Sequence, residues 1–197
     1  MSHFRPVALE HASRLLNHGP TVLVTSAHGG RRNVMAAAWS MPVEFTPPRV
    51  AVVIDKRTFT RELVMAAGAF GLCVPGAVLA DATYGVGSVS GRDVPDKFAR
   101  HGLEPHAGPV LGLPVLEDGC CAWLECRLIA ERHTEDAYDT CFGEVVAAAA
   151  DPRVFDAGRW RLDAGPAALH TLHHLGGGAF AVAGRLVQAG ACPSQPR

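Results

Sequence analysis

The chain has 197 residues, of which 48% are hydrophobic and 19% charged, and its formal net charge is −1. Such a composition is typical of a folded globular protein and argues against disorder. Because there is no surplus of basic residues, we expect neither nucleic acid nor an anionic membrane as a partner. The length favours one domain, which we place at residues 1–190, with 191–197 as a loose tail.

The sequence also bears on the cellular compartment. No apolar run approaches the roughly 20 residues that span a bilayer. The N-terminal stretch MSHFRPVALEHASRLLNHG is charged and interrupted, so we expect no signal peptide and a cytoplasmic protein. No two cysteines form a C-x-x-C pair, and we expect reduced, mostly buried thiols at Cys73, Cys120, Cys121, Cys126, Cys141 and Cys192.

The first half of the chain reads as a hairpin followed by a strand and a helix. A short helix is expected at 7–17, a strand at 21–27 and a return strand at 34–45, joined by a turn at Gly29 and Gly30. Small residues at 36–38 leave the backbone of the return strand uncovered. A buried strand at 50–54 precedes a helix at 60–68, for which Thr60 is the expected N-cap.

The second half is dominated by strands. We expect a strand at 69–74, short helices at 78–85 and 96–102, and long strands at 120–134 and 140–150. Residues 170–186 read as irregular and then strand-like. Since strands and helices do not alternate regularly, a doubly wound parallel sheet is disfavoured. The fold class is therefore expected to be mainly β, an antiparallel barrel with inserted helices.

The stretch TYGVGSVSGRDVPDKF, residues 83–98, resembles a nucleotide loop but fails each motif. Ser90 stands where a dinucleotide fingerprint needs its third glycine, and Arg92 stands where a P-loop needs lysine. Neither Ser88 nor Ser90 is in a G-x-S-x-G context. Hydroxyls, glycine N–H groups and two cations still make the stretch a candidate anion site, the alternative being a surface loop.

Two other stretches are candidates for ligand binding. DKRTFTREL, residues 55–63, joins a strand to a helix start, where free N–H groups and the helix dipole favour a phosphate. The alternative is a capped helix with solvated charges. Ala36, Ala37 and Ala38 allow a flat ligand to approach the backbone, or they pack tightly against a helix, and Trp39 is either beside that ligand or in the core.

Taken together in order and spacing, these stretches resemble the flavin reductase-like family of FMN-binding split barrels, which includes flavoredoxin-type proteins. The pieces that carry the resemblance, from Pro20 to Gly184, are P20-T-V-L-V-T-S, N33-V-M-A-A-A-W, T46-P-P-R-V-A-V-V-I, T58-F-T-R-E-L, S88-V-S-G-R-D-V-P-D-K-F, L124-E-C-R-L, F142-G-E-V-V and H174-L-G-G. The resemblance implies a Greek-key-like split β-barrel, a homodimer, and noncovalent FMN near the subunit interface.

The resemblance also implies which residues contact the cofactor. The isoalloxazine would lie against Asn33, Val34, Met35, Ala36, Ala37, Ala38 and Trp39. The ribityl phosphate would lie near Asp55, Lys56, Arg57, Thr58 and Thr60, and the remaining wall would be Ser88, Ser90, Gly91, Lys97 and Phe98. His174 would be near the flavin, while Lys97 could instead pair with Asp93 or Asp96.

The implied activity is that of an NAD(P)H:flavin oxidoreductase, with FMN as cofactor, FAD as a possible substitute and the nicotinamide dinucleotide as a transient co-substrate. No catalytic side chain and no metal are expected, because the flavin carries the chemistry. The electrons would go to a partner oxygenase or a small acceptor.

Three alternatives stay open at this point. The first is a flavoredoxin-like electron carrier that does not reduce free flavin. The second is a metal hydrolase using His170, His173 and His174, which would need a further ligand and a carboxylate. The third is a non-enzymatic module on the same fold, with His133 as a possible haem ligand.

Overall fold

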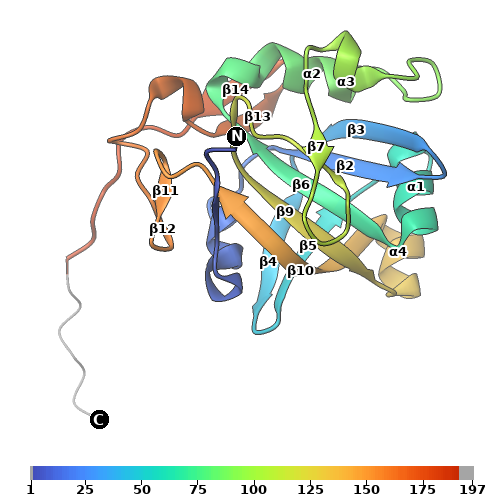
Figure 1. Cartoon of the computed structure of the whole chain (residues 1–197), viewed down its shortest axis with the longest axis horizontal. Coiled ribbons are helices and arrows are strands. Elements are labelled where there is room, and N and C mark those ends of the chain that lie inside the picture. Colours follow the sequence, from blue (N-terminus) through green and yellow to red (C-terminus); the bar gives the residue numbers. More distant parts are fainter. Residues whose placement is uncertain (1, 191–197) are drawn as a thin grey trace.

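The computed structural model describes residues 2–190, so the expected tail at 191–197, with Cys192, lies outside the described residues. The principal strands are β2 (Val22–His28), β3 (Arg31–Ala37), β4 (Ser40–Phe45), β5 (Pro48–Val53), β6 (Ala69–Pro75), β9 (Cys120–Ile129) and β10 (Thr140–Ala150), as Figure 1 shows. The shorter strands are β1 (Arg5–Pro6), β7 (His106–Ala107), β8 (Pro114–Val115), β11 (Phe155–Asp156), β12 (Arg159–Trp160), β13 (Leu172–Gly176) and β14 (Ala179–Val182).

Helices are inserted between these strands. The α-helices are α1 (Phe59–Ala67), α2 (Ala80–Ser88), α3 (Lys97–Arg100) and α4 (Arg132–Tyr138). The 3-10 helices are η1 (Leu9–Leu15), η2 (Ala77–Leu79) and η3 (Ala167–Leu169). Among the described residues, no helix is long and apolar enough to cross a membrane.

The main sheet is antiparallel and rolls into a split barrel. Its strands follow the order β3-β2-β6-β9-β10-β5-β4, and β1 pairs with β10. The first and last strands of that order, β3 and β4, are consecutive in the chain and are separated only by Ala38 and Trp39. Because two residues span only a few ångströms, the two ends of the sheet must lie close together, and the expected antiparallel split barrel is confirmed.

The expectation of one return strand over 34–45 is wrong. β3 pairs with β2 as far as Ala37, and β4 begins at Ser40, where pairing with β5 starts. The carbonyl of Trp39 accepts a hydrogen bond of 3.0 Å from the backbone N–H of Val53. The chain therefore changes partner strand at Ala38–Trp39, which a pattern of side chains alone does not reveal.

A second correction concerns the strand expected at 120–134. It ends at Ile129, and residues 132–138 form α4. Arg61 of α1 fixes this helix, because its buried guanidinium donates to the carbonyls of Ile54, Glu135 and Asp139. His133 accordingly lies exposed on a helix, not at the end of a strand.

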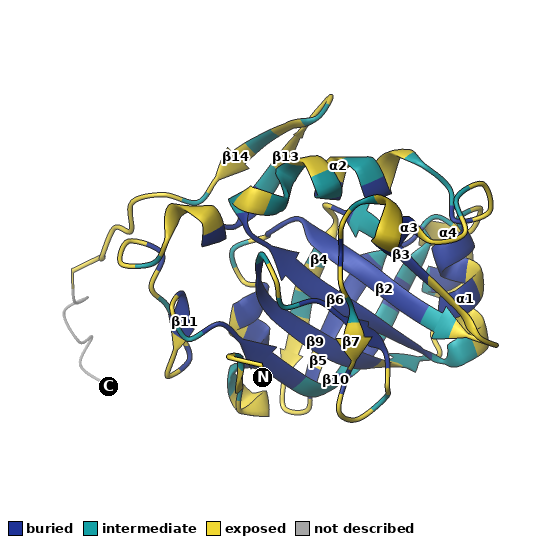
Figure 2. Ribbon diagram, turned by 45° about the horizontal axis from the view of Figure 1, so that its top comes forward, coloured by how far each residue is buried: buried dark blue, intermediate teal, exposed yellow. Residues whose placement is uncertain are grey.

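The strands bury both of their faces. Along β2, Val22 and Val24 face the barrel interior, where they belong to the same cluster as Val50 and Leu72, whereas Leu23 faces outward. The outward side chains form a second cluster that is covered by α2, α3 and the segment after α3, and Figure 2 shows the buried strands beneath these elements. This second layer is what holds the helices beside β3.

One buried carboxylate organises the loop between β7 and β8. Glu125 of β9 is fully buried, and it accepts hydrogen bonds from the backbone N–H groups of Val110, Leu111 and Leu113 at 2.8, 2.9 and 3.2 Å. A Cβ at Gly108 would collide with this carboxylate. The loop is thus wrapped around a single side chain that the sheet supplies.

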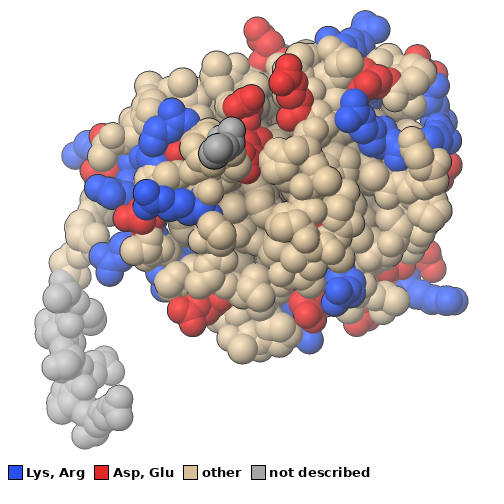
Figure 3. Space-filling model, in the orientation of Figure 1, with Lys and Arg blue, Asp and Glu red and all other residues tan. Residues whose placement is uncertain are grey.

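The surface is mixed in charge. In Figure 3, acidic and basic side chains lie mainly around the rim of the face in view, and its centre is largely uncharged.

Candidate functional site

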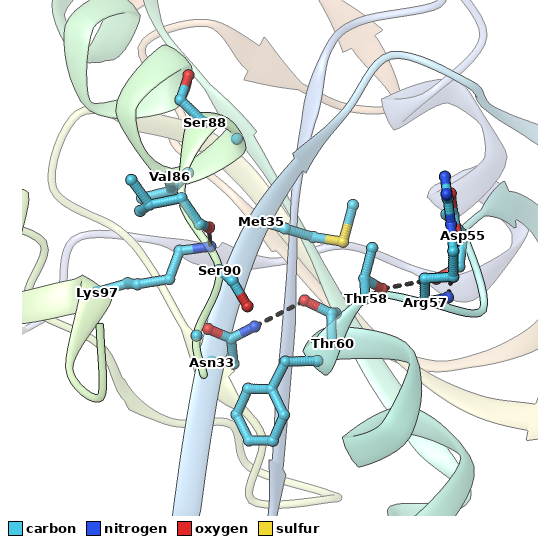
Figure 4. Close-up of a pocket in the computed structure, with 14 residues that line it drawn as sticks. Asn33, Met35, Asp55, Arg57, Thr58, Thr60, Val86, Ser88, Ser90 and Lys97 are labelled. Carbon is cyan, nitrogen blue, oxygen red and sulfur yellow. Dashed lines mark hydrogen bonds and ion pairs between the residues drawn. The ribbon is translucent and has the colours of Figure 1, made fainter. Parts of the chain in front are cut away.

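A large cavity of about 410 Å³ lies between β3, the start of α1 and the end of α2. Figure 4 shows its polar side chains converging from these elements. The cavity is lined by Asn33, Met35, Asp55, Arg57, Thr58, Phe59, Thr60, Val86, Gly87, Ser88, Val89, Ser90, Gly91 and Lys97. Its volume lies within the range of small-molecule and cofactor sites.

Asn33 is locked in place at the floor of this cavity. Its side-chain amide donates a buried hydrogen bond of 2.7 Å to the hydroxyl of Thr60. A Cβ at Gly91 would collide with the Asn33 carbonyl oxygen and with the Phe59 ring. The chain can pass over Asn33 only because position 91 is glycine.

Thr58, and not Thr60, caps helix α1. The Thr58 hydroxyl accepts from the backbone N–H of Arg61 at 3.2 Å and donates to the carbonyl of Asp55 at 2.8 Å. The expectation that Thr60 is the N-cap is therefore wrong, because Thr60 lies inside the helix and faces Asn33. Just before the helix, hydrogen bonds from Arg57 lower the pKa of Asp55 to about 2.

Lys97 brings a buried cation to the cavity. The residue is only 2% exposed, and its Nζ donates to the carbonyl of Val89 at 2.9 Å. The predicted alternative, an ion pair with Asp93 or Asp96, is not formed: Asp96 pairs with Arg32 at 3.1 Å. Burial lowers the pKa of Lys97 from 10.5 to about 8. Within residues 2–190, no carboxylate lies within ion-pair distance of this ammonium group.

A small pocket of about 180 Å³ adjoins the large cavity, and Gly87 and Ser88 line both. The other residues around it are Thr21, Ala36, Ala37, Ala38, Thr83, Tyr84, His174 and Phe180. Its walls come from β3, α2 and the hairpin of β13 and β14. The pocket brings His174 to the same place as Ala36, Ala37 and Ala38.

Most predicted site residues thus line one of the two spaces, but four line neither. Val34 and Phe98 are fully buried in the outer cluster behind β3. Lys56 is directed to α4, where its Nζ donates to the carbonyl of Asp136 at 2.7 Å. Trp39 is 74% exposed, so the alternative of a core aromatic is wrong.

Sequence reasoning missed several lining residues. Val86, Gly87 and Val89 fall within the 83–98 stretch, of which only Ser88, Ser90, Gly91, Lys97 and Phe98 had been singled out. Thr83 and Tyr84 lie in the same stretch, and Phe180 follows the glycines of the hairpin. An apolar or aromatic residue carries no distinguishing signal by itself, so only the fold identifies these positions.

The histidines near β13 serve a hydrogen-bond network. The hydroxyl of Thr171 lies 3.0 Å from Nε2 of His18 and 3.3 Å from Nε2 of His173, and Nδ1 of His173 lies 3.1 Å from the carbonyl of Gly19. No three His, Cys, Asp or Glu side chains gather as metal ligands in the part of the chain that the structure describes. His173 therefore ties β13 to the start of β2.

Residues 14–176 match the flavin reductase like domain family. The chain belongs to this family. It is 58% identical over 192 residues to the uncharacterized protein YddH of Escherichia coli (strain K12), covering 96% of this chain and 100% of YddH.

Solved structures of flavin reductase-like proteins agree with this assignment. An FMN-binding domain of a flavin reductases-like enzyme from Shewanella baltica OS155 has 42% identity and a TM-score of 0.92, over 95% of this chain and 97% of that chain. The flavoredoxin of Methanosarcina acetivorans has 22% identity and a TM-score of 0.69, over 86% of this chain and 87% of that chain, and it shows the fold alone.

Proposed function

We propose that the protein binds FMN in the large cavity and acts as an NAD(P)H:flavin oxidoreductase. The observation that carries the proposal is Lys97, a buried ammonium group at the cavity wall without a carboxylate partner among the described residues. An unpaired buried cation is unfavourable by itself, and an anionic phosphate relieves that cost. The Shewanella baltica domain, 42% identical, is an FMN-binding protein.

The residues around Lys97 fit a ribityl phosphate. Ser90 offers a hydroxyl, and Thr58 and Thr60 stand at the start of α1, where backbone N–H groups and the helix dipole favour negative charge. The side-chain amide of Asn33 donates to Thr60, so its free carbonyl oxygen suits a hydroxyl of the ribityl chain and not the phosphate itself. The phosphate would lie at this end of the cavity.

The flavin ring would lie along β3 toward Gly87 and Ser88. β3 is an end strand of the sheet within residues 2–190, so alternate backbone N–H and C=O groups on its free edge have no partner strand. Such groups can hydrogen-bond the polar edge of a flat heterocycle. When bound, FMN supplies two-electron redox chemistry with NAD(P)H. The chain itself binds, orients and shields the ring, and we assign it no catalytic side chain.

We also propose a homodimer. Along β4 and the residue before it, Trp39, Met41, Val43 and Phe45 are 74, 57, 41 and 67% exposed. A β-bulge between Pro42 and Glu44 shifts the alternation of this strand, so the four side chains do not all share one face, but together they make an exposed apolar stretch. An exposed apolar stretch of this kind marks a protein interface. Covering it with a second copy would enclose the split between β3 and β4, beside the proposed flavin site.

A spectrum tests the proposal. The protein is mixed with FMN, freed of unbound flavin, and reduced anaerobically with NADH and then NADPH. Retained bands near roughly 370 and 450 nm that bleach with either donor would support it. Retained bands that do not bleach would instead favour an electron carrier of the flavoredoxin type. Absence of flavin binding would refute the proposal. If the protein binds FMN and also reduces an excess of free FMN, the result would favour supply of reduced flavin to a partner oxygenase over reduction of a bound acceptor.

A further inference from the structure

A third cavity, of about 280 Å³, lies on the outer face of β9 and β10. The N-terminal segment over residues 2–9 and Pro109 of the loop after β7 form its sides, and Trp123, Ala147 and Ala149 form its floor. None of its lining residues lines the large cavity or the small pocket. In the order of the sheet, β2 and β6 stand between β9 and β3. This cavity is therefore separate from the proposed FMN site.

The hollow exists because the strand beside Trp123 carries only small side chains. Ala149 of β10 is the direct partner of Trp123 in the β9–β10 ladder, and Ala147 packs against the same outer cluster. Alanine covers little of the sheet, so space is left beside the indole, and Phe4 and Leu9 enclose it from the N-terminal segment. A cavity of about 150 Å³ is large enough for benzene. The 280 Å³ of this cavity therefore fits one ring with a short chain.

One carboxylate, that of Glu117, lies at the wall of this otherwise mainly apolar cavity, and its side chain is only 12% exposed. Its Oε1 accepts hydrogen bonds from Ser2 Oγ at 2.8 Å and Trp123 Nε1 at 3.4 Å, and His106 Nε2 lies 3.3 Å from the same oxygen. Within residues 2–190, Oε2 has no hydrogen-bond donor, and no Lys or Arg lies within ion-pair distance of the carboxylate. A largely buried charge is unfavourable unless an opposite charge pairs with it.

We propose that this cavity binds an organic ammonium ion with one apolar ring, whose ammonium group donates to Oε2 of Glu117 and whose ring lies against Trp123. An ammonium group supplies both the missing donor and the missing positive charge. The aromatic walls at Phe4 and Trp123 suit the ring, and aromatic faces also attract cations. An anion would be repelled by Glu117, and a neutral compound would leave its charge unpaired. This site does not depend on the proposed function.

The probe is 2-phenylethylamine, with 2-phenylethanol as the matched ligand that keeps the shape and lacks the charge. Binding is measured by calorimetry on the protein with and without FMN. We expect the amine to bind equally in both cases, and the alcohol to bind about tenfold more weakly. Glu117→Gln keeps an acceptor for Ser2 and Trp123 but removes the charge, so it should weaken amine binding about tenfold. Asp118→Asn is the matched control, since Asp118 is exposed and does not line the cavity, and it should change the affinity less than twofold.

The indole N–H resonance of Trp123 shows where the amine binds. It is assigned with Trp123→Phe, and it should shift on addition of the amine, whereas the resonances of Trp39 and Trp160 should not. Ala147→Leu should fill the hollow and abolish binding, with circular dichroism as the check that this variant is folded. The proposal is overturned if the amine does not bind, if the alcohol binds equally well, or if Glu117→Gln leaves the affinity unaltered. Displacement of the amine by FMN would also overturn it, because the amine would then lie in the flavin cavity.

Discussion

Replacing Lys97 by methionine should affect binding and stability in opposite ways. The lowering of the Lys97 pKa from 10.5 to about 8 corresponds to at most about 3 kcal/mol against the charged form. Water at the mouth of the cavity screens part of this penalty, so the charged form is disfavoured by about 1–2 kcal/mol. Loss of the hydrogen bond to Val89 costs about 1 kcal/mol. The free energy of unfolding of the flavin-free protein should therefore stay unchanged or rise by up to about 1 kcal/mol.

FMN binding should weaken in the same variant, because a charged hydrogen bond to the phosphate is lost. A loss of about 1.5–3 kcal/mol gives a Kd roughly 10- to 150-fold higher. The dissociation constant is measured by quenching of FMN fluorescence, and stability by urea unfolding without flavin. Lys56→Met is the matched control, since Lys56 is directed toward Asp136, and it should leave the Kd within about twofold. Unchanged FMN affinity in Lys97→Met would refute the phosphate assignment.

The pH dependence supplies an independent check on the same side chain. Between pH 8 and 10.5 the unfolded chain binds more protons at Lys97 than the folded chain does. The free energy of unfolding of the flavin-free protein should thus rise over this interval. FMN affinity should fall as pH rises above 8, because the ammonium loses its charge, and both trends should be reduced in Lys97→Met.

Three further predictions concern the supports of the site. Gly91→Ala would force Asn33 and Phe59 aside, so urea unfolding should show a loss of about 1–3 kcal/mol, with weaker FMN binding in the same titration. Thr58→Ala should cost about 1 kcal/mol of stability through loss of the helix cap, whereas Thr58→Ser should not; equal stability of the two variants would contradict the capping role. Burial, followed by the charge of His173, lowers the pKa of His18 from 6.5 to about 4. Between pH 6.5 and pH 4, the unfolded chain binds more protons at His18 than the folded chain does. The free energy of unfolding should therefore fall by up to about 3 kcal/mol as the pH is lowered from 6.5 to 4. A slope that is unchanged in His18→Gln would exclude His18 as its source.

The apolar strand patterns and the family resemblance together predicted the barrel. Each strand leaves a local pattern of apolar residues in the sequence, and the order and spacing of the motifs indicated the family. The break at Trp39 was not predictable, since it arises where β3 leaves β2 and β4 joins β5. Either partner alone would have allowed a continuous strand. The change of partner is decided by the closure of the whole sheet.

The candidate site was likewise predictable only in part. Asn33 was predicted from the family resemblance and Thr58 from its position before a helix start, and both line the large cavity. The difference between Thr58 and Thr60 as the cap depends on a backbone that turns two residues earlier than expected. The burial of Lys97 was not visible either, because its neighbours Asp93 and Asp96 gave a plausible ion pair, and only the packing of α3 beside β3 turns the ammonium toward the cavity.

The loop wrapped around Glu125 limits which substitutions are tolerated at positions 108 and 125. Gly108 has no room for a methyl group while the carboxylate is present, and the carboxylate has no substitute for its N–H donors if the loop moves. A change at either position alone is therefore unfavourable, whereas a paired change that shortens residue 125 frees position 108. Among related chains, positions 108 and 125 should vary together. An alanine at position 108 should coincide with the loss of glutamate at position 125.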